Sequence, residues 1–250
     1  MLQQTQTSRV VEPWRRFLVA FPTPAACAQA PLATVLRHWA GLGYHRRAKA
    51  LHESARIIRE HHDGRVPRDV EALRALPGVG EYTANAVASF AYGEPVAVLD
   101  TNVGRVLARA IENRTLRPRE ARDVARSLLP RRQVAQFNQS MLDLGALFCR
   151  SSPRCAECPL QRACRWHLEG GEDPAPTSAG VSRRQSAFEG STRQLRGRLL
   201  SVLREGDLTR QEFRSWARSV DDERLDGVVR DLVADGLVES TSERVTLANR

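Results

Sequence analysis

The stretch Leu76-Pro77-Gly78-Val79-Gly80 lies between two short helix candidates and constrains the fold more than any other part of the chain. Residues 69–75 form the first candidate, and residues 82–92, rich in small side chains, form the second. Glycine tolerates positive φ and has no side chain, so another backbone can approach such a turn closely. The second helix directs its free N–H groups back at the turn, and a helix start of this kind attracts a phosphate. A lone G-x-G is usually an ordinary turn, but two flanking helices predict a clamp for the DNA backbone at Gly78, Val79 and Gly80.

Charge favours a polyanionic partner. The chain has 250 residues, a net charge of +9 and a pI of about 10.3, and a basic chain of this kind favours nucleic acid over an acidic protein. A GC-rich genome that prefers arginine codons explains part of the excess. The sequence contains no run of 18 apolar residues and no apolar signal segment at its start, which predicts a cytoplasmic, nucleoid-associated protein without a membrane span.

Helical spacing of apolar residues continues on both sides of the hairpin. Residues 1–21 predict one helix, residues 23–39 a second, and a third begins at Tyr44 after the break at Gly41-Leu42-Gly43. Basic side chains gather beside Tyr44, which indicates either a site for a partly unstacked strand or a solvated basic face. These basic residues are His45, Arg46, Arg47 and Lys49.

Further helices are expected over residues 103–111, 119–129 and 137–147. Asp100 and Asn102 precede or begin the first of them, and both residue types are natural helix caps. Nothing before Cys149 alternates as a strand does, so the main domain is predicted to be all-α. Cys27 stands alone in an apolar stretch and is expected in the core.

Four cysteines lie within sixteen residues, in the pattern Cys149-x5-Cys155-x2-Cys158-x5-Cys164. In a cytosolic chain such a group indicates a metal centre rather than disulfides. Both zinc and a [4Fe–4S] cluster accept four thiolates, and spacing alone does not choose between them. The presence of one C-x2-C pair, rather than two, favours the cluster.

The sequence divides into four parts: a helical domain (1–148), the cysteine loop (149–168), a flexible linker (169–191) and a small module (192–250). The linker is rich in Gly, Pro, Ser and charge. The module contains three amphipathic helix candidates followed by a two-stranded hairpin at residues 236–239 and 244–247. This order predicts a winged-helix-like α+β module that either binds DNA or packs on the rest of the chain.

Several motifs then occur in one order: MLQQTQ, GLGY, LPGVGEYTA, VLDTNVGRVLAR, FNQSMLDLGALFC and CxxCPL. Over residues 1–166 the chain resembles the helix-hairpin-helix DNA glycosylases with an iron–sulfur loop, and among them the MutY adenine DNA glycosylases. The resemblance implies a monomeric enzyme acting on double-stranded DNA. It would flip out adenine mispaired with 8-oxoguanine or guanine and hydrolyse the N-glycosidic bond. The four cysteines would hold a [4Fe–4S] cluster.

The resemblance also implies residue roles. Asp100 would be the catalytic carboxylate and Asn102 would orient it. Tyr82 stands where the related endonuclease III enzymes have a Schiff-base lysine, which implies base removal without strand cleavage. Gln3 and Gln4 would fill the gap left by the flipped base, and Tyr44 and His45 would lie near the opposing base. The DNA-binding residues expected are Gln3, Gln4, Thr5, Gly41, Tyr44, His45, Arg46, Gly78, Val79 and Gly80.

The chain departs from the MutY pattern in three places. The family's general-acid glutamate falls two positions before Met1, so we expect either a longer native protein or a nearly inactive one, and favour the first. The first cysteine gap has five residues where the family usually has six, and residues 192–250 do not resemble the family's NUDIX-like domain. Two alternatives therefore stand beside adenine removal: a thymine glycosylase acting on G:T mismatches, and a non-catalytic DNA-binding protein.

Overall fold

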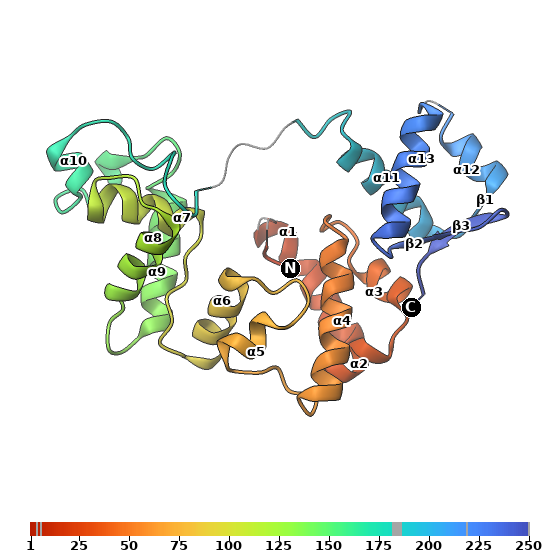
Figure 1. The fold of residues 1–250 in the computed structure, drawn as a ribbon, viewed down its shortest axis with the longest axis horizontal. Coiled ribbons are helices and arrows are strands. Elements are labelled where there is room, and N and C mark those ends of the chain that lie inside the picture. The colour runs from red at the N-terminus through yellow and green to blue at the C-terminus, as the bar shows by residue number, and fades with distance from the viewer. Residues whose placement is uncertain (4, 6, 182–186, 219, 250) are drawn as a thin grey trace. The chain divides into compact units, whose positions relative to one another are not determined.

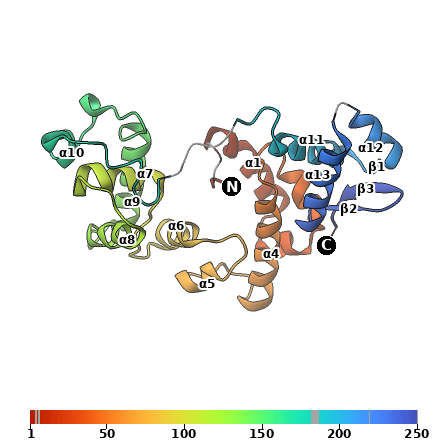
Figure 2. The ribbon, with the colours of Figure 1, turned by 45° about the horizontal axis from the view of Figure 1, so that its top comes forward.

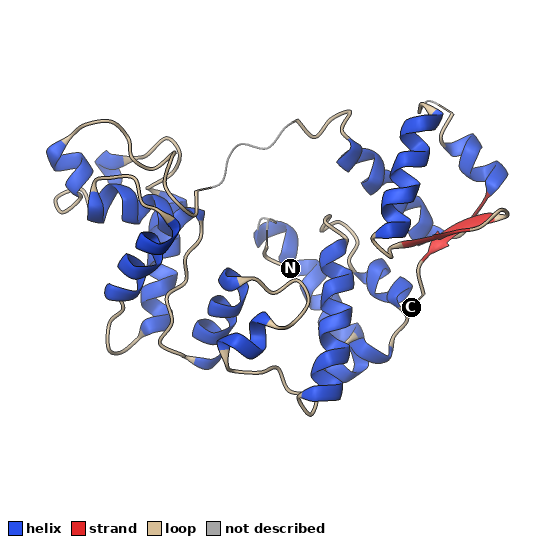
Figure 3. Cartoon of the chain, viewed as in Figure 1, coloured by secondary structure: helices blue, strands red, loops and turns tan. Residues whose placement is uncertain are grey.

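The computed structural model describes residues 1–3, 5, 7–181, 187–218 and 220–249; Gln4, an expected DNA contact, lies outside them. The chain divides into two compact units. Unit 1 contains Met1–Pro67, Leu76–Gly78 and Ser186–Arg250, and unit 2 contains Arg68–Ala75 and Val79–Gln185. Helices dominate both units, and the strands drawn in red in Figure 3 follow residue 207, which confirms the predicted fold class. No helix within the described ranges is long and apolar enough to cross a bilayer.

Unit 1 begins with four helices: α1 (Thr7–Ala20), α2 (Pro24–Gln29), α3 (Leu32–His38) and α4 (Arg46–His61). The single helix predicted over residues 23–39 is wrong, because it is two helices. Ala30 is extended, with φ −73° and ψ 147°, since a residue before proline is disfavoured in the α region. Pro31 then serves as the N-cap of α3.

The C-terminal module also belongs to unit 1. It contains α11 (Thr192–Glu205), β1 (Leu208–Thr209), α12 (Arg210–Trp216), α13 (Asp222–Ala234), β2 (Val238–Ser240) and β3 (Arg244–Leu247), drawn in blue shades in Figure 1. The sheet is antiparallel in the order β1-β3-β2. The predicted hairpin is present, but the prediction missed β1, whose two residues are too few to show alternation. The order helix, strand, helix, helix, strand, strand is that of a winged helix.

One hydrophobic core joins this module to the N-terminal helices. Leu32 and Trp39 are buried in the same core as Leu199 and Leu232. Cys27 is 4% exposed in this core, as predicted, and burial raises the pKa of its thiol to about 11. The module therefore packs on the helical domain, as one of the two alternatives predicted.

Unit 2 contains α5 (Val70–Arg74), α6 (Glu81–Tyr92), α7 (Thr101–Val106), the π-helical turn η1 (Leu107–Glu112), α8 (Pro118–Ser127) and α9 (Val134–Leu147). The cysteine loop follows with the 3-10 turn η2 (Cys155–Glu157) and α10 (Arg165–Glu169), a helix that the sequence analysis did not predict. Helices α7, α8 and α9 gather in one group in Figures 1 and 2. Their apolar core includes Val103, Leu107, Leu116 and Ala121.

Residues 173–181, which we call the strap, differ from the flexible linker expected there. Ala175 is 1% exposed and Ser178 is 5% exposed. The Leu116 N–H donates to Ser178 Oγ (3.0 Å), and the Ala179 N–H donates to the Leu116 carbonyl (2.8 Å). Buried side chains and paired backbone groups anchor the strap to unit 2, although its composition is that of a linker.

Candidate active site and cysteine lobe

Helix α4 shapes the glycine hairpin. Gly78 has φ +71°, and a Cβ added there would lie 2.7 Å from the Ala50 Cβ, so the turn requires glycine. Ser54 Oγ donates to the Pro77 carbonyl (3.0 Å), and Gln3 Nε2 donates to the Gly78 carbonyl (3.4 Å). This packing leaves Gly78 exposed at the turn. In unit 2, Val79 is half-buried and Gly80 is the exposed N-cap of α6.

Arg47 joins the start of the chain to the glycine-rich loop that begins at Gly41 (φ +80°). Its guanidinium lies 5.3 Å from the centroid of the Tyr44 ring. It donates to Thr5 Oγ1 (2.9 Å) and to the Gln3 carbonyl. The structure thus brings Gln3, Thr5 and Tyr44 together around Arg47, and their contact with DNA stays a prediction. The sequence analysis placed Arg47 only in a basic group, because spacing along the chain does not show contacts between residues forty positions apart.

His45 and Arg46 contact the C-terminal module. His45 Nε2 lies 3.3 Å from Arg204 Nη1 on α11, and Arg46 Nη2 forms an ion pair with Asp235 Oδ1 at 2.7 Å. Burial, together with the positive charge of Arg204, lowers the pKa of His45 to about 4. His45 is therefore a neutral ring at physiological pH. The Arg46 side chain remains 73% exposed despite its partner. The DNA contacts of these two residues stay predictions.

The start of α7 fixes the Asp100 carboxylate at both oxygens. Oδ1 accepts from the Val103 N–H (2.8 Å), which is the N-cap bond, and Oδ2 accepts from Asn102 Nδ2 (2.8 Å). Burial, with the negative charge of Asp100 adding to it, raises the pKa of Tyr82. The Tyr82 phenol is thus held in its protonated, hydrogen-bond-donating form. A carboxylate fixed in this way can stabilise a positive charge that develops beside it.

Arg105 connects Asn102, the partner of this carboxylate, to the cysteine loop. Its Nη2 donates to Asn102 Oδ1 (2.7 Å) and to the Gly145 carbonyl (2.9 Å), while its Nε donates to the Cys149 carbonyl (2.6 Å). The sequence analysis missed this residue. The signal available was the i,i+3 spacing from Asn102, which places both side chains on one face of a helix.

Helix α9 approaches α7 at Gly145, where a Cβ would lie 2.4 Å from the Asn102 carbonyl oxygen. We expect Gly145→Ala to lower the free energy of unfolding by about 1–3 kcal/mol, because the added methyl group forces the two backbones apart. Gly197→Ala is the matched control: Gly197 lies inside α11 with no neighbour within 4 Å of its added Cβ. It should raise stability by about 0.5–1 kcal/mol. Denaturant unfolding measures both, and equal effects would contradict this close packing.

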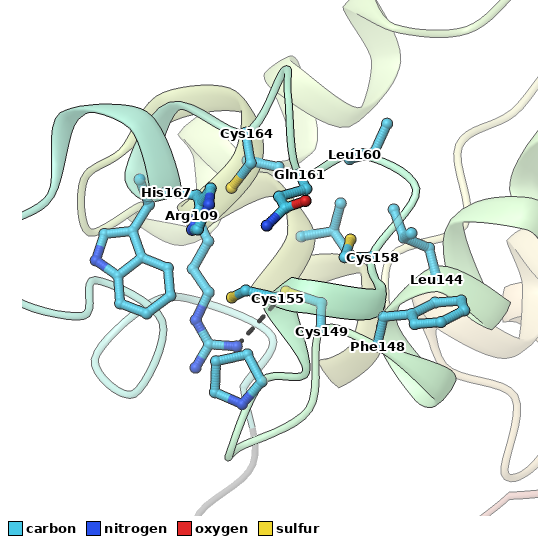
Figure 4. Close-up of a pocket in the computed structure, with 14 residues that line it drawn as sticks. Arg109, Leu144, Phe148, Cys149, Cys155, Cys158, Leu160, Gln161, Cys164 and His167 are labelled. Carbon is cyan, nitrogen blue, oxygen red and sulfur yellow. Dashed lines mark hydrogen bonds between the residues drawn. The ribbon is translucent and has the colours of Figure 1, made fainter.

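The four cysteine side chains line one pocket (Figure 4). All four thiols are free of disulfides, and Arg109 Nη1 lies 3.5 Å from Cys149 Sγ. Burial raises the pKa of the Cys149 thiol, against the opposite effect of Arg109, and burial also raises that of Cys155. Among the described residues, no three His, Cys, Asp or Glu side chains form a group that could hold a single metal ion. The apolar residues around the thiols include Leu144, Phe148, Pro153 and Leu160.

Comparison with known families and curated proteins gives consistent results. Residues 1–131 match the HhH-GPD superfamily base excision DNA repair protein model. The chain is 46% identical over 250 residues to the adenine DNA glycosylase of Mycobacterium tuberculosis (strain H37Rv), covering 96% of this chain and 80% of that protein. It is 40% identical over 172 residues to the Homo sapiens adenine DNA glycosylase, covering 66% and 32%. The mycobacterial match is long enough to include most of residues 192–250.

Solved structures give the same fold. A thermostable thymine-DNA glycosylase aligns with a TM-score of 0.63 and 29% identity, over 67% of this chain and 80% of that chain. A trapped endonuclease III–DNA covalent intermediate aligns with a TM-score of 0.61 and 29% identity, over the same shares.

Proposed function

The chain belongs to the HhH-GPD superfamily of base excision DNA repair proteins, and on that premise we propose that it removes adenine mispaired with 8-oxoguanine or guanine from double-stranded DNA. The reaction is hydrolysis of the N-glycosidic bond. The observation that carries the proposal is the Asp100 carboxylate, held at both oxygens by Asn102 and the α7 backbone, in a chain 46% identical to an adenine DNA glycosylase.

Asp100 and Asn102 at the start of α7, and Tyr82 on α6, each have a chemical role in this proposal. Departure of the base leaves a sugar with oxocarbenium character, and the Asp100 carboxylate stabilises that charge or bonds to the anomeric carbon. Asn102 keeps one carboxylate oxygen in place. Tyr82 cannot form a Schiff base, so the enzyme is monofunctional and leaves the DNA strand intact.

The proposed DNA contacts are found in each of the two units. The exposed hairpin at Gly78, with Val79 and Gly80, offers backbone groups to phosphates. The surface that Arg47 organises, with Gln3, Thr5 and Tyr44, reads the opposing base. Gly41, His45 and Arg46 complete the DNA-binding set, and the protein works as a monomer.

We infer that Cys149, Cys155, Cys158 and Cys164 hold a [4Fe–4S] cluster. Four free thiols around one cavity are a suitable donor set. The single Cys-x2-Cys pair, where four-cysteine zinc sites usually have two, favours the cluster over zinc. When bound, the cluster would cross-link the loop at its four cysteines. Arg105, which bonds both the Cys149 carbonyl and Asn102, would then hold Asn102 against a fixed loop.

The purified protein should be brown and contain about four iron atoms per chain. Cys158→Ser should abolish the visible absorbance and lower the iron content, because the cluster loses one of its four thiolates. Cys27→Ala should leave both unchanged, since Cys27 is buried in the core of unit 1. Absorption spectra and iron and zinc analysis are the measurements, and a colourless protein that contains zinc would overturn the inference.

A glycosylase assay tests the proposed function. Duplexes with A opposite 8-oxoguanine, A opposite G, and T opposite G are incubated with this chain and with any longer product of its reading frame. Release of adenine, without strand cleavage, is the expected result. Release of thymine instead would establish the second candidate, which the structural match to a thymine-DNA glycosylase favours. DNA binding without release of either base would show a non-catalytic protein.

A further inference from the structure

We infer that the strap, residues 173–181, is a positioning element that holds the start of α7 and thereby sets the orientation of the Asp100 carboxylate. The inference rests on the proposed catalytic role of Asp100. It concerns a segment whose sequence is that of a linker and whose side chains would not themselves touch the reacting base.

The strap contacts the residues on which the carboxylate depends. Thr101 Oγ1 donates to the Gly180 carbonyl at 2.7 Å. Gly180 has φ +82°, and a Cβ added there would lie 3.3 Å from the Asp100 carbonyl oxygen. That oxygen accepts the first helical bond of α7, from the Gly104 N–H at 2.8 Å. Gly180 therefore lies against the backbone at the point where the helix begins.

A second close approach occurs one turn further along α7. A Cβ added at Gly104 would lie 2.8 Å from the Ala179 carbonyl oxygen and 3.6 Å from Val181 Cγ2. Glycine on the helix at this point, and glycine on the strap at 180, allow the two backbones to run in contact. The strap thus meets both ends of the first turn of α7.

The rest of the strap is anchored beyond the end of α7, at Leu116 and at Arg109 on η1. Ser178 Oγ accepts from the Leu116 N–H and donates to the Pro174 carbonyl at 2.8 Å. At its start, Asp173 Oδ1 accepts from Arg109 Nε at 2.8 Å, and the Arg109 side chain is 1% exposed. Because Leu116 lies outside α7 and η1, its bonds to Ser178 and Ala179 hold the strap from a point other than the helix that carries Asp100.

A side chain at a helix N-cap follows the backbone that carries it. Small misplacement of a catalytic group, of about 1 Å, can cost on the order of 10² in rate. The hydroxyl bond from Thr101 and the contact at Gly180 both restrain that backbone. The strap should therefore affect the rate of base release at saturation and leave the affinity for DNA unchanged.

The test is a comparison of Thr101→Val with Thr101→Ser. Valine keeps the branched shape and removes the hydroxyl that donates to Gly180, whereas serine retains it. We expect the single-turnover rate of adenine release to fall about tenfold in Thr101→Val, with a wild-type rate in Thr101→Ser. The Kd for a duplex with a non-cleavable adenosine analogue should remain within about twofold in both, since phosphate and base contacts are unaltered.

Ser127→Ala is the control, because Ser127 Oγ likewise donates to a backbone carbonyl, that of Val124 at 2.9 Å, on α8. It should release adenine at the wild-type rate. Gly180→Ala is the second variant if Thr101→Val does not fold, and it too should slow release without weakening DNA binding. Wild-type rates in folded Thr101→Val and Gly180→Ala would overturn this inference and leave the proposed function unaffected. Absence of adenine release by the unaltered protein would instead reject the proposed function.

Discussion

Replacing Asp100 with asparagine should lower the single-turnover rate of adenine release by about 10³-fold while duplex binding stays at the wild-type level. The amide has nearly the same shape as the carboxylate, and asparagine is itself a good N-cap. The bond from the Val103 N–H to Oδ1 is therefore retained. The negative charge that would stabilise the sugar cation is lost. The measurements are adenine release from an A:8-oxoguanine duplex and the Kd for a duplex with a non-cleavable adenosine analogue.

Asp69→Asn separates catalysis from capping. Asp69 is the N-cap of α5, and its Oδ1 accepts from the Ala72 N–H at 2.9 Å, which matches the cap at Asp100. This control variant should retain its full rate of release, because Asp69 has no proposed part in the chemistry. Adenine release that survives Asp100→Asn would show that another group stabilises the transition state.

Arg105→Leu should have the second-largest effect. It leaves three acceptors without their partner: Asn102 Oδ1 and the carbonyl oxygens of Gly145 and Cys149. A buried acceptor left unpaired costs about 1–3 kcal/mol, and these three bonds are partly buried, so we expect a total loss of about 1–3 kcal/mol in the free energy of unfolding. Release of adenine should slow by about 10²-fold, since Asn102 loses the contact that orients it. Denaturant unfolding and single-turnover kinetics measure these two consequences separately, and the iron content shows whether the cysteine loop is affected.

The matched control is Arg122→Leu, which removes the same guanidinium from an exposed pair with Glu81 at 3.7 Å. Exposed ion pairs contribute about 1 kcal/mol or less, so stability and rate should change little. If Arg105→Leu behaves like Arg122→Leu, the hydrogen bonds of Arg105 to Cys149 and Asn102 contribute little to stability or to the rate of release. A rate loss in Arg105→Leu with full stability and iron content would confine its role to orienting Asn102.

Much of the fold could be predicted from local patterns. The hairpin was predicted from two glycines between two helix candidates, and the structure adds the reason for glycine at 78: a positive φ and no room for a Cβ beside Ala50. Helices were predicted because their apolar faces repeat every three or four residues. Two features were missed because apolar periodicity does not show them. Pro31 divides the predicted helix over residues 23–39, and β1 has only two residues.

The candidate site followed from residue types and motif order rather than from geometry. Asp100 and Asn102 lie close in sequence, Tyr82 was identified by its place in the motif LPGVGEYTA, and the spacing of the four cysteines indicates a metal centre. The sequence left two possible roles for Asp100, a helix cap or a catalytic group. The structure shows that one oxygen caps the helix while Asn102 holds the other, so the first role leaves room for the second.

By itself, then, the sequence determined the helical class, the glycine turn, the cysteine set and the family resemblance, because each depends on residue type and short spacing. The tertiary structure alone decided the contacts of Arg47 and Arg105, the close approach at Gly145 and the anchoring of the strap. It also decided that the C-terminal module shares a core with α3. These features depend on which backbones approach one another, and apolar periodicity reports only which face of a helix is buried, not what buries it.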